Sequence, residues 1–241
     1  MSGPKHVHDA ASLTILYEDN HLLVVVKPVN MPTQEDESRD PDLLNVLKAD
    51  LKHRHQKPGN VYLGLVHRLD RPVGGVMVFA KTSKAASRLS DAVRTRHFDK
   101  TYIAVVHGKP PQKQGTLVHW LLKDTTVNTV SVVKEGVAGA KEAILDYQLL
   151  DSLDGFSLVK VKLRTGRPHQ IRVQLAAIGC PLYGDQRYGA HVNKPGQQLS
   201  LWARKLSFEH PVQKEQLSFH SEPPEQYPWN LWSTLIGDLT E

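Results

Sequence analysis

Asp70 lies between two arginines in a short polar stretch that interrupts an apolar one. Residues 63–82 read LGLVHRLDRPVGGVMVFAKT, with Arg68 and Arg71 on either side of the aspartate. A carboxylate at the edge of a core and beside guanidinium groups stays ionised, as a nucleophile or a base must be. Taken singly, an aspartate in a turn commonly only forms the turn. The two arginines favour a chemical role for Asp70.

Two later residues could assist such an acid. Tyr102 lies in KTYIAVVHG, where its ring could stack on a flat base and its phenol could exchange a proton. Arg172 lies in RTGRPHQIRVQLAAIG, near the start of a predicted helix, where anions are favoured. The alternatives are a core tyrosine and a solvent-exposed helix arginine, and the residue types alone leave both open.

The elements that must position Asp70 are readable from the apolar pattern. The runs on either side of residues 67–71 predict two strands joined by a polar turn. Earlier, LTILYEDNHLLVVVKP predicts two strands around a turn at 18–20. Leucines at helical spacing then predict an amphipathic helix over about 42–54, with Asp40 as its N-cap and Pro41 as its first residue.

The rest of the chain continues the same mixture of strands and helices. SKAASRLSDAVRTR predicts a second helix, and KTYIAVVHGKPP a strand that ends at Gly108. Residues 115–164 alternate β-rich runs with turns, as an antiparallel meander does. A helix follows Pro168 with Ile171 and Leu175 facing the core, and two more strands follow residue 199. The fold class is therefore α+β, a mixed and mainly antiparallel sheet with flanking helices.

The length and the absence of linkers favour one catalytic domain. Among the 241 residues we expect a flexible leader over 1–12, a single domain over 13–225 and a C-terminal tail over 226–241. No stretch is long and apolar enough to span a bilayer, and the first residues are unlike a secretory signal. These features predict a cytoplasmic protein without a membrane partner.

Charge and residue counts restrict the partners and cofactors. The net charge of +5 and the arginine clusters agree with a polyanionic partner. Cys180 is the one cysteine, which excludes an intrachain disulfide and a cysteine-based zinc site. The sequence also lacks a His-Glu-x-x-His motif, a P-loop and a Gly-x-Gly-x-x-Gly motif. We therefore expect neither a metal, nor a nucleotide cofactor, nor any other cofactor.

Four blocks of the chain resemble one enzyme family. His67-Arg68-Leu69-Asp70, followed by Gly74-Gly75 and an apolar strand, resembles the signature of the RluA-type pseudouridine synthases. The stretches VVVKPVNMP, KTYIAVVHG and RTGRPHQIRVQLAAIGCPLYGD are similar to further blocks of that family, in the same order. One departure is Val73-Gly74, where the family commonly has Thr-Ser, so that two hydroxyls are absent near the site.

The resemblance implies a fold, an activity and a set of roles. It implies the pseudouridine synthase catalytic fold and the isomerisation of uridine to pseudouridine within ribosomal RNA or transfer RNA, with ribosomal RNA favoured. Asp70 would be the catalytic nucleophile, Tyr102 would lie against the base and Arg172 would pair with the aspartate. We expect these residues to contact RNA: Lys27, His67, Arg68, Arg71, Arg167 and His169.

The organisation and the rival functions follow from the same comparison of motifs. We expect a monomer without the separate N-terminal RNA-binding domain that some family members carry. A catalytically inactive RNA-binding or ribosome-assembly protein on the same fold is one alternative. An aspartate-dependent glycosidase is another, but it needs a second positioned carboxylate as proton donor, and the matched blocks do not supply one.

Overall fold

The computed structural model describes residues 13–239, so the predicted leader over 1–12 lies outside the described residues. The chain forms two compact units. The first consists of the chain up to Phe98 together with Leu206–Ser221, and the second of Asp99–Lys205 together with the chain from Glu222. The single catalytic domain expected over 13–225 stays a prediction beside this division.

The sheet of the first unit carries the turn of Asp70. Strand β2 (Leu22–Lys27) pairs antiparallel with β1 (Thr14–Glu18) on one side and with β4 (Gly74–Ala80) on the other. The short strand β3 (Gly64–Leu65) also pairs with β4. The turn between β1 and β2 forms because a carboxylate oxygen of Asp19 accepts the amides of residues 21 and 22, at 2.7 and 2.6 Å. The predicted strand pairs are confirmed.

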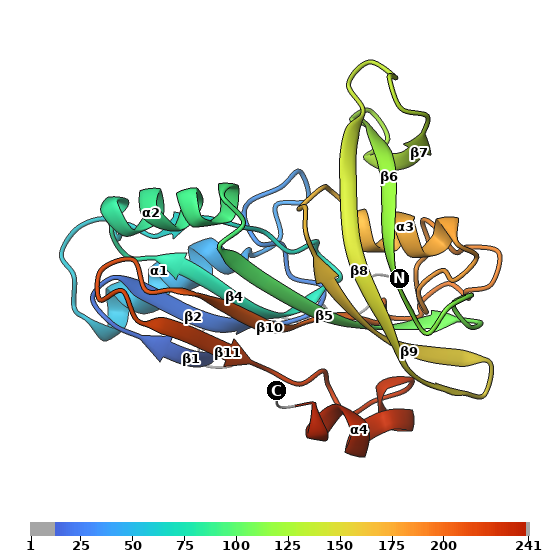
Figure 1. Cartoon of the computed structure of the whole chain (residues 1–241). Coiled ribbons are helices and arrows are strands. Elements are labelled where there is room, and N and C mark those ends of the chain that lie inside the picture. The colour runs from blue at the N-terminus through green and yellow to red at the C-terminus, as the bar shows by residue number, and fades with distance from the viewer. Residues whose placement is uncertain (1–12, 240–241) are drawn as a thin grey trace. The chain divides into compact units, whose positions relative to one another are not determined.

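Two helices accompany this sheet. Helix α2 (Ser83–Arg94) buries Ala85 and Leu89 in a core shared with β2 and β4, and Figure 1 shows it above these strands. Helix α1 (Leu43–Arg54) buries three of the four leucines whose spacing predicts it, at i, i+4 and i+8, while Leu44 is only partly buried. Because every residue of β4 is buried, the sheet is covered on both faces where it supports the Asp70 turn.

The predicted N-cap of α1 is wrong. Asp42, and not Asp40, caps the helix, because its carboxylate accepts the amide of Asn45 at 3.0 Å and its side-chain amide at 2.8 Å. Both aspartates are good capping residues, and the sequence pattern does not distinguish them. Asp40 instead accepts a hydrogen bond from Nη1 of Arg71 at 2.7 Å.

The second unit is built on the predicted antiparallel meander. Its strand order is β5 (Phe98–His107), β9 (Phe156–Leu163), β8 (Lys141–Leu153), β6 (Gln114–Asp124) and β7 (Thr129–Val133). Each neighbouring pair is antiparallel. Figure 1 shows β6 and β8 as two long neighbouring strands with β7 near one end of the pair and α3 (Gln170–Ala177) beside it.

The C-terminal elements belong partly to each unit. Strand β10 (Leu201–Glu209) begins in the second unit and ends in the first, where β11 (Gln216–His220) pairs with it. The 3-10 helix η2 (Trp229–Trp232) and α4 (Ser233–Asp238) end the described chain.

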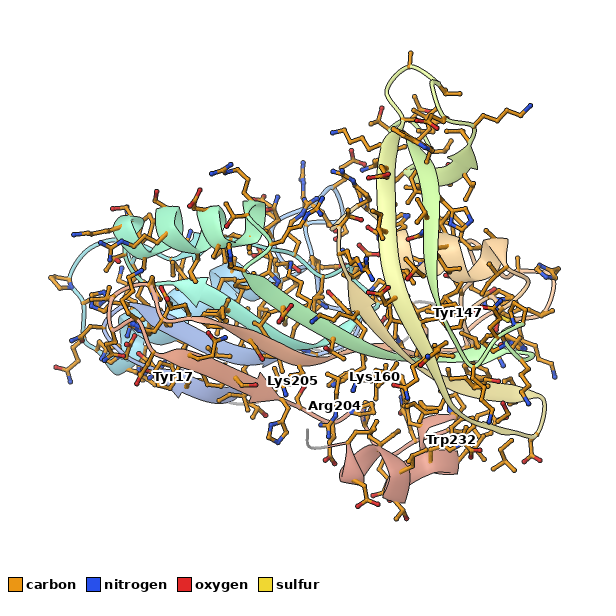
Figure 2. All side chains as sticks on the ribbon, in the orientation of Figure 1. Tyr17, Tyr147, Lys160, Arg204, Lys205 and Trp232 are labelled. Atoms are coloured by element: carbon orange, nitrogen blue, oxygen red, sulfur yellow. The ribbon has the colours of Figure 1, made fainter. Side chains whose placement is uncertain are left out.

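Most of the predicted tail over 226–241 is described and packed. Trp229 and Trp232 are buried, and Nε1 of Trp232 donates to Asp151 of β8 at 2.8 Å. Arg204 of β10, also buried, donates from Nη2 to the carbonyl of Ile236 at 3.1 Å. Figure 2 labels Trp232 and Arg204. These bonds fasten the end of the chain to the second unit.

The fold is α+β, and the strand pairs among β1 to β9 described above are antiparallel, as predicted. Within residues 13–239, no helix is long and apolar enough to cross a membrane.

Candidate active site

Asp70 lies on a tight turn between β3 and β4. The two strands pair Gly64 with Ala80 and Leu65 with Phe79, so the intervening chain leaves the sheet and returns to it. The amide of Val73 donates to the carbonyl of Asp70 at 3.0 Å, which closes the turn. The aspartate is half-buried. Its carboxylate is therefore carried by a fixed backbone at the rim of the core, as the sequence pattern predicts.

Lys27 holds this turn in place through hydrogen bonds to backbone carbonyls. It ends β2, has no exposed surface, and donates from Nζ to the carbonyls of Pro28, Arg71 and Val73 at 2.9, 3.0 and 2.7 Å. Burial lowers the pKa of Lys27 to about 7, although the charge of Asp70 acts to raise it. A side chain without exposed surface does not reach a phosphate, so the expected RNA contact at Lys27 is corrected to a role in holding the turn.

The residues just before Asp70 are held from the core. The hydroxyl of Thr33 donates to the carbonyl of Leu69 at 2.8 Å. His67 is only 8% exposed, and its Nε2 accepts the amide of Val78 at 3.1 Å. Its ring contacts Phe98 edge-on at 5.3 Å. His67 therefore supports the turn from inside, and its expected RNA contact stays a prediction.

The two arginines beside Asp70 differ in their surroundings. Arg68 is exposed and makes no hydrogen bond or ion pair with the part of the chain that the structure describes. Arg71 binds the acidic loop before α1, with Nη1 at 2.7 Å from Asp40 and Nη2 at 3.0 Å from both carboxylate oxygens of Asp36. Nη2 of Arg71 also donates to Ser38. Arg68 is thus the more available of the two for RNA.

Tyr102 lies in the middle of β5, in the second unit. It pairs in register with Val161 of β9 and is only 6% exposed. The residue is therefore held by the sheet with little surface exposed to solvent. The stacking role expected of Tyr102 stays a prediction.

Arg172 is buried in the second unit with a partner that the sequence pattern did not identify. Its Nε and Nη2 donate to the two carboxylate oxygens of Asp185 at 2.7 and 2.8 Å. One of these oxygens also accepts the amides of Arg187 and Tyr188, at 2.9 and 3.1 Å. Burial alone would raise the pKa of Asp185, but these hydrogen bonds and the charge of Arg172 lower it below its usual 3.8.

Asp185 had a signal in the sequence, because it ends the block RTGRPHQIRVQLAAIGCPLYGD. The preceding Gly184 has φ +76°, and a Cβ there would lie 2.2 Å from the carbonyl oxygen of Gln198. Only glycine fits this position, and it fixes the direction in which Asp185 leaves the chain. A Gly-Asp step in a matched block was the available clue.

His169 and Arg167 surround the start of α3. His169 stands at the N-cap with φ 51°, and its Nδ1 lies 2.7 Å from the hydroxyl of Tyr188. The guanidinium of Arg172 lies over the Tyr188 ring, 5.2 Å from its centroid. Nε of Arg167 donates to the carbonyl of Glu142 at 2.8 Å, while the side chain keeps some exposed surface. Arg167 and His169 stay predicted RNA contacts.

The structure thus assembles the predicted site residues in two groups. Lys27, His67 and Arg71 surround the Asp70 turn in the first unit, and Arg167, His169 and Arg172 surround the start of α3 in the second. The pairing of Arg172 with Asp70 stays a prediction. A carboxylate on a rigid turn could attack an electron-poor carbon or take a proton, which is the chemistry expected of Asp70.

The comparisons with known proteins identify the family. Residues 21–177, more than half of the chain, match the family model described as RNA pseudouridylate synthase. The chain belongs to this family. Its enzymes isomerise uridine to pseudouridine within RNA, so the predicted enzyme class and RNA substrate are confirmed. The match runs through both compact units.

Individual relatives agree with the family model. The chain is 34% identical over 225 residues to the Ribosomal large subunit pseudouridine synthase D of Zymomonas mobilis, covering 88% of this chain and 70% of the relative. It is 33% identical over 219 residues to the Uncharacterized RNA pseudouridine synthase YjbO of Bacillus subtilis, covering 88% and 73%.

A solved structure also matches. Human RNA Pseudouridylate Synthase Domain Containing 4 has a TM-score of 0.78 at 26% identity, covering 92% of this chain and 94% of that one. The predicted pseudouridine synthase catalytic fold is confirmed.

Proposed function

We propose that this enzyme isomerises a uridine of ribosomal RNA and that Asp70 performs the central step. The choice of RNA is supported by relatives named Ribosomal large subunit pseudouridine synthase D in Zymomonas mobilis and Pseudomonas aeruginosa, at 34% and 33% identity. The choice of residue rests on one observation. Asp70 is half-buried on a turn whose backbone is fixed by the buried ammonium of Lys27.

The reaction begins with extraction of the base, because a stacked and paired uridine is out of reach of any side chain. Arg68 is exposed and precedes the catalytic turn, which suits it to occupy the position that the base leaves. Other phosphate contacts, to which Arg167 can contribute, supply most of the affinity and hold the RNA while the nucleoside is turned outward.

The chemistry is an isomerisation without change of redox state. The bond between C1′ of ribose and N1 of uracil breaks, the uracil turns, and a bond forms between C1′ and C5. The proton on C5 is lost and N1 gains one, so atoms balance. Asp70 attacks the sugar, attacks the base, or removes a sugar proton, and each of these uses the same ionised carboxylate. Tyr102 lies against the ring and is available for proton transfer.

Arg172 is proposed to keep Asp70 ionised. Asp185 accepts hydrogen bonds from Nε and Nη2 of Arg172, and a guanidinium has five N–H donors. The same arginine can therefore serve a second carboxylate while Asp185 holds its orientation. The order of the motifs, shared with the family, supports this pairing.

The experiment compares two classes of RNA. Transcripts of large-subunit ribosomal RNA and a pool of transfer RNA transcripts are incubated with the enzyme and labelled with carbodiimide, and reverse-transcription stops are mapped. We expect stops at one or a few positions of the ribosomal transcript. Modification confined to transfer RNA would contradict the choice of RNA, and modification of neither would favour the inactive RNA-binding alternative.

A further inference from the structure

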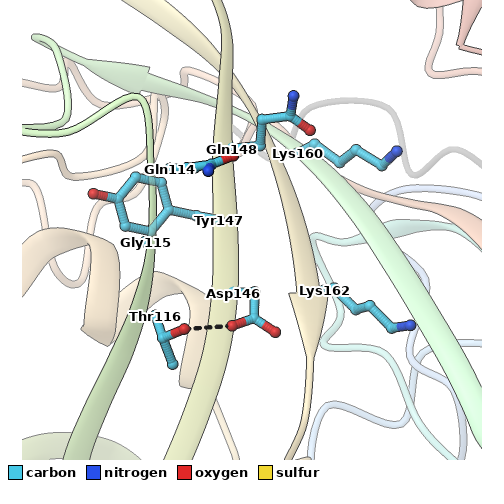
Figure 3. Close-up of a pocket in the computed structure, with 8 residues that line it drawn as sticks. All are labelled: Gln114, Gly115, Thr116, Asp146, Tyr147, Gln148, Lys160 and Lys162. Carbon is cyan, nitrogen blue, oxygen red and sulfur yellow. Dashed lines mark hydrogen bonds between the residues drawn. The ribbon is translucent and has the colours of Figure 1, made fainter.

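A pocket of about 360 Å³ lies on the second unit. Figure 3 shows its side chains on three neighbouring strands, β6, β8 and β9. These residues line the pocket: Gln114, Gly115, Thr116, Asp146, Tyr147, Gln148, Lys160 and Lys162. Two lysines and several amides on an open sheet face need an explanation, since core packing does not require them.

One row of side chains, which runs across the three strands, has polar groups without a hydrogen bond to the described residues. Gln114 of β6 pairs with Gln148 of β8, and Gln148 pairs with Lys160 of β9, so the three side chains lie side by side across the strands. Within residues 13–239, none of the three side chains makes a hydrogen bond or an ion pair. Figure 3 shows Lys160 extended away from the sheet.

In the neighbouring row of side chains, the polar groups already have partners within the protein. Thr116 donates to Asp146 at 2.6 Å, and Asp146 also binds Arg164 at 2.6 and 2.8 Å. The hydrogen bond from Arg164 lowers the pKa of Asp146, so this acid is ionised and already partnered at neutral pH. Lys162 lies 3.2 Å from Asp99. The difference between the rows places the available donors and acceptors on Gln114, Gln148 and Lys160.

The strands that carry the polar row are tightly packed against each other. Tyr147 of β8 pairs with Gly115 of β6 and is only 5% exposed. A Cβ on Gly115 would lie 3.1 Å from the tyrosine ring, so the glycine lets the ring pack against the neighbouring strand. The polar row therefore stands on a packed sheet, which limits how far its side chains can move toward other protein groups.

We propose that this pocket binds the RNA strand that flanks the target uridine, with Lys160 on a phosphate and the amides of Gln114 and Gln148 on the edge of one base. A glutamine amide both donates and accepts, as a base edge does, and an ammonium suits a phosphate. The proposal rests on the proposed function only in that the ligand is RNA.

The test is a binding measurement that does not depend on turnover. A fluorescein-labelled fragment of large-subunit ribosomal RNA is titrated with wild-type protein and with Lys160→Gln, by fluorescence anisotropy at several salt concentrations. We expect Lys160→Gln to raise Kd about three- to tenfold and to reduce the slope of log Kd against log salt by about 0.7–1. Gln148→Ala should weaken binding without changing that slope, because it removes no charge.

The matched control is Lys84→Gln, which removes the same charge from the exposed surface of α2. Kd and slope should stay at their wild-type values in this variant. At saturating RNA, Lys160→Gln should keep the wild-type kcat and change only KM, because it does not touch the reacting atoms. Its thermal unfolding should also be unchanged, since the lysine has no partner within the described chain to lose.

The outcomes separate this proposal from the proposed function. If Lys160→Gln binds RNA with the wild-type Kd and slope, or if Lys84→Gln loses as much affinity, the proposed RNA site at the pocket is disproved. This holds whatever the turnover assay gives. If ribosomal RNA is never modified but Lys160→Gln still weakens RNA binding more than Lys84→Gln does, the RNA site at the pocket is supported and the proposed reaction is disproved.

Discussion

Two carboxylates of this enzyme, Asp70 in the first unit and Asp185 in the second, are held in opposite ways. At Asp70 the protein fixes the main chain, because Lys27 donates to the carbonyls of Arg71 and Val73. At Asp185 the protein fixes the side chain. That carboxylate has no exposed surface and accepts two donors of Arg172 and two backbone amides.

The contacts that hold Asp185 also determine its chemistry. A carboxylate saturated with charged and backbone donors is stabilised as an anion and has little basicity left. Asp185 therefore acts by orienting Arg172. The hydrogen bonds from Lys27 go to backbone carbonyls, so they fix the turn on which Asp70 lies. Substitution of Asp70 should therefore act mainly on activity, whereas substitution of Asp185 should lower the stability and, through the orientation of Arg172, the activity as well.

The largest effect is expected for Asp70→Asn. The amide cannot act as nucleophile or base, so kcat should fall by on the order of 10³ or more, while RNA affinity stays close to wild type. Mass spectrometry of the RNA measures the pseudouridine formed. The free energy of unfolding should change less than in Asp185→Asn, because Lys27 holds the turn through carbonyls that the substitution leaves in place. Pseudouridine formation at the wild-type rate would remove Asp70 from the mechanism.

Asp185→Asn should mainly cost stability. The amide leaves a buried guanidinium partly unpaired, and the free energy of unfolding should fall by about 3–5 kcal/mol in urea denaturation. In the wild type this contribution is lost as the pH falls through the pKa of Asp185, which lies below 3.8, because the protonated acid no longer pairs with Arg172. The same stability loss in Asp70→Asn would abolish the contrast between the two aspartates.

Much of this arrangement could be predicted from the sequence, because it depends on local patterns. The apolar runs around Asp70 predicted β3 and β4, and the spacing of Ala85 and Leu89 predicted the buried face of α2. The alternation over 115–164 gave the antiparallel strands of the second unit. In each case a side-chain period of two or of 3.6 residues decides the element, and no distant partner is needed.

The missed features all depend on partners far along the chain. Lys27 resembles any basic residue at a strand end, and only the return of the chain at Arg71 and Val73 buries it. Arg172 was expected to partner Asp70, and its ion pair with Asp185 forms only because Gly184 turns the chain. Likewise His67 accepts an amide from β4, which a sequence pattern does not reveal.

Lys27→Met tests whether the turn is held through its backbone. Three carbonyls lose their donor, so at mildly alkaline pH the free energy of unfolding should fall by about 1–3 kcal/mol. The rate of pseudouridine formation should fall with it, because the backbone next to Asp70 is released. Lys48→Met, a substitution of a partly exposed lysine on α1, serves as the control and should leave both quantities unchanged. Wild-type activity in Lys27→Met would show that the turn needs no such support.

The pH dependence of the same variant gives a second measurement. The pKa of Lys27 is about 7 in the folded protein and 10.5 when unperturbed, so the unfolded state binds more protons between these values. Wild-type stability should therefore rise with pH across this window, by up to about 1.4 kcal/mol per pH unit, relative to Lys27→Met. Parallel curves for the two proteins would contradict the buried, proton-releasing lysine.

The smallest effect is expected at the acidic loop that binds Arg71. The ion pair of Arg71 with Asp40 is partly exposed, with side chains 34% and 36% accessible, so Asp40→Asn should change the free energy of unfolding by less than about 1 kcal/mol. The substitution makes the charge of Arg71 more available to phosphates, and RNA affinity should rise about two- to threefold at low salt.

Asp50→Asn is the matched control for Asp40→Asn, because Asp50 pairs with Arg54 at the same distance of 2.7 Å, on α1 and away from the Asp70 turn. It removes one negative charge from the same unit. If the expected local effect exists, anisotropy titrations with labelled RNA should show tighter binding for Asp40→Asn than for Asp50→Asn. Equal gains in the two variants would mean that net charge, and not the release of Arg71, controls the affinity. Arg71 would then serve only to hold the acidic loop before α1, and the first unit would contact RNA chiefly through Arg68.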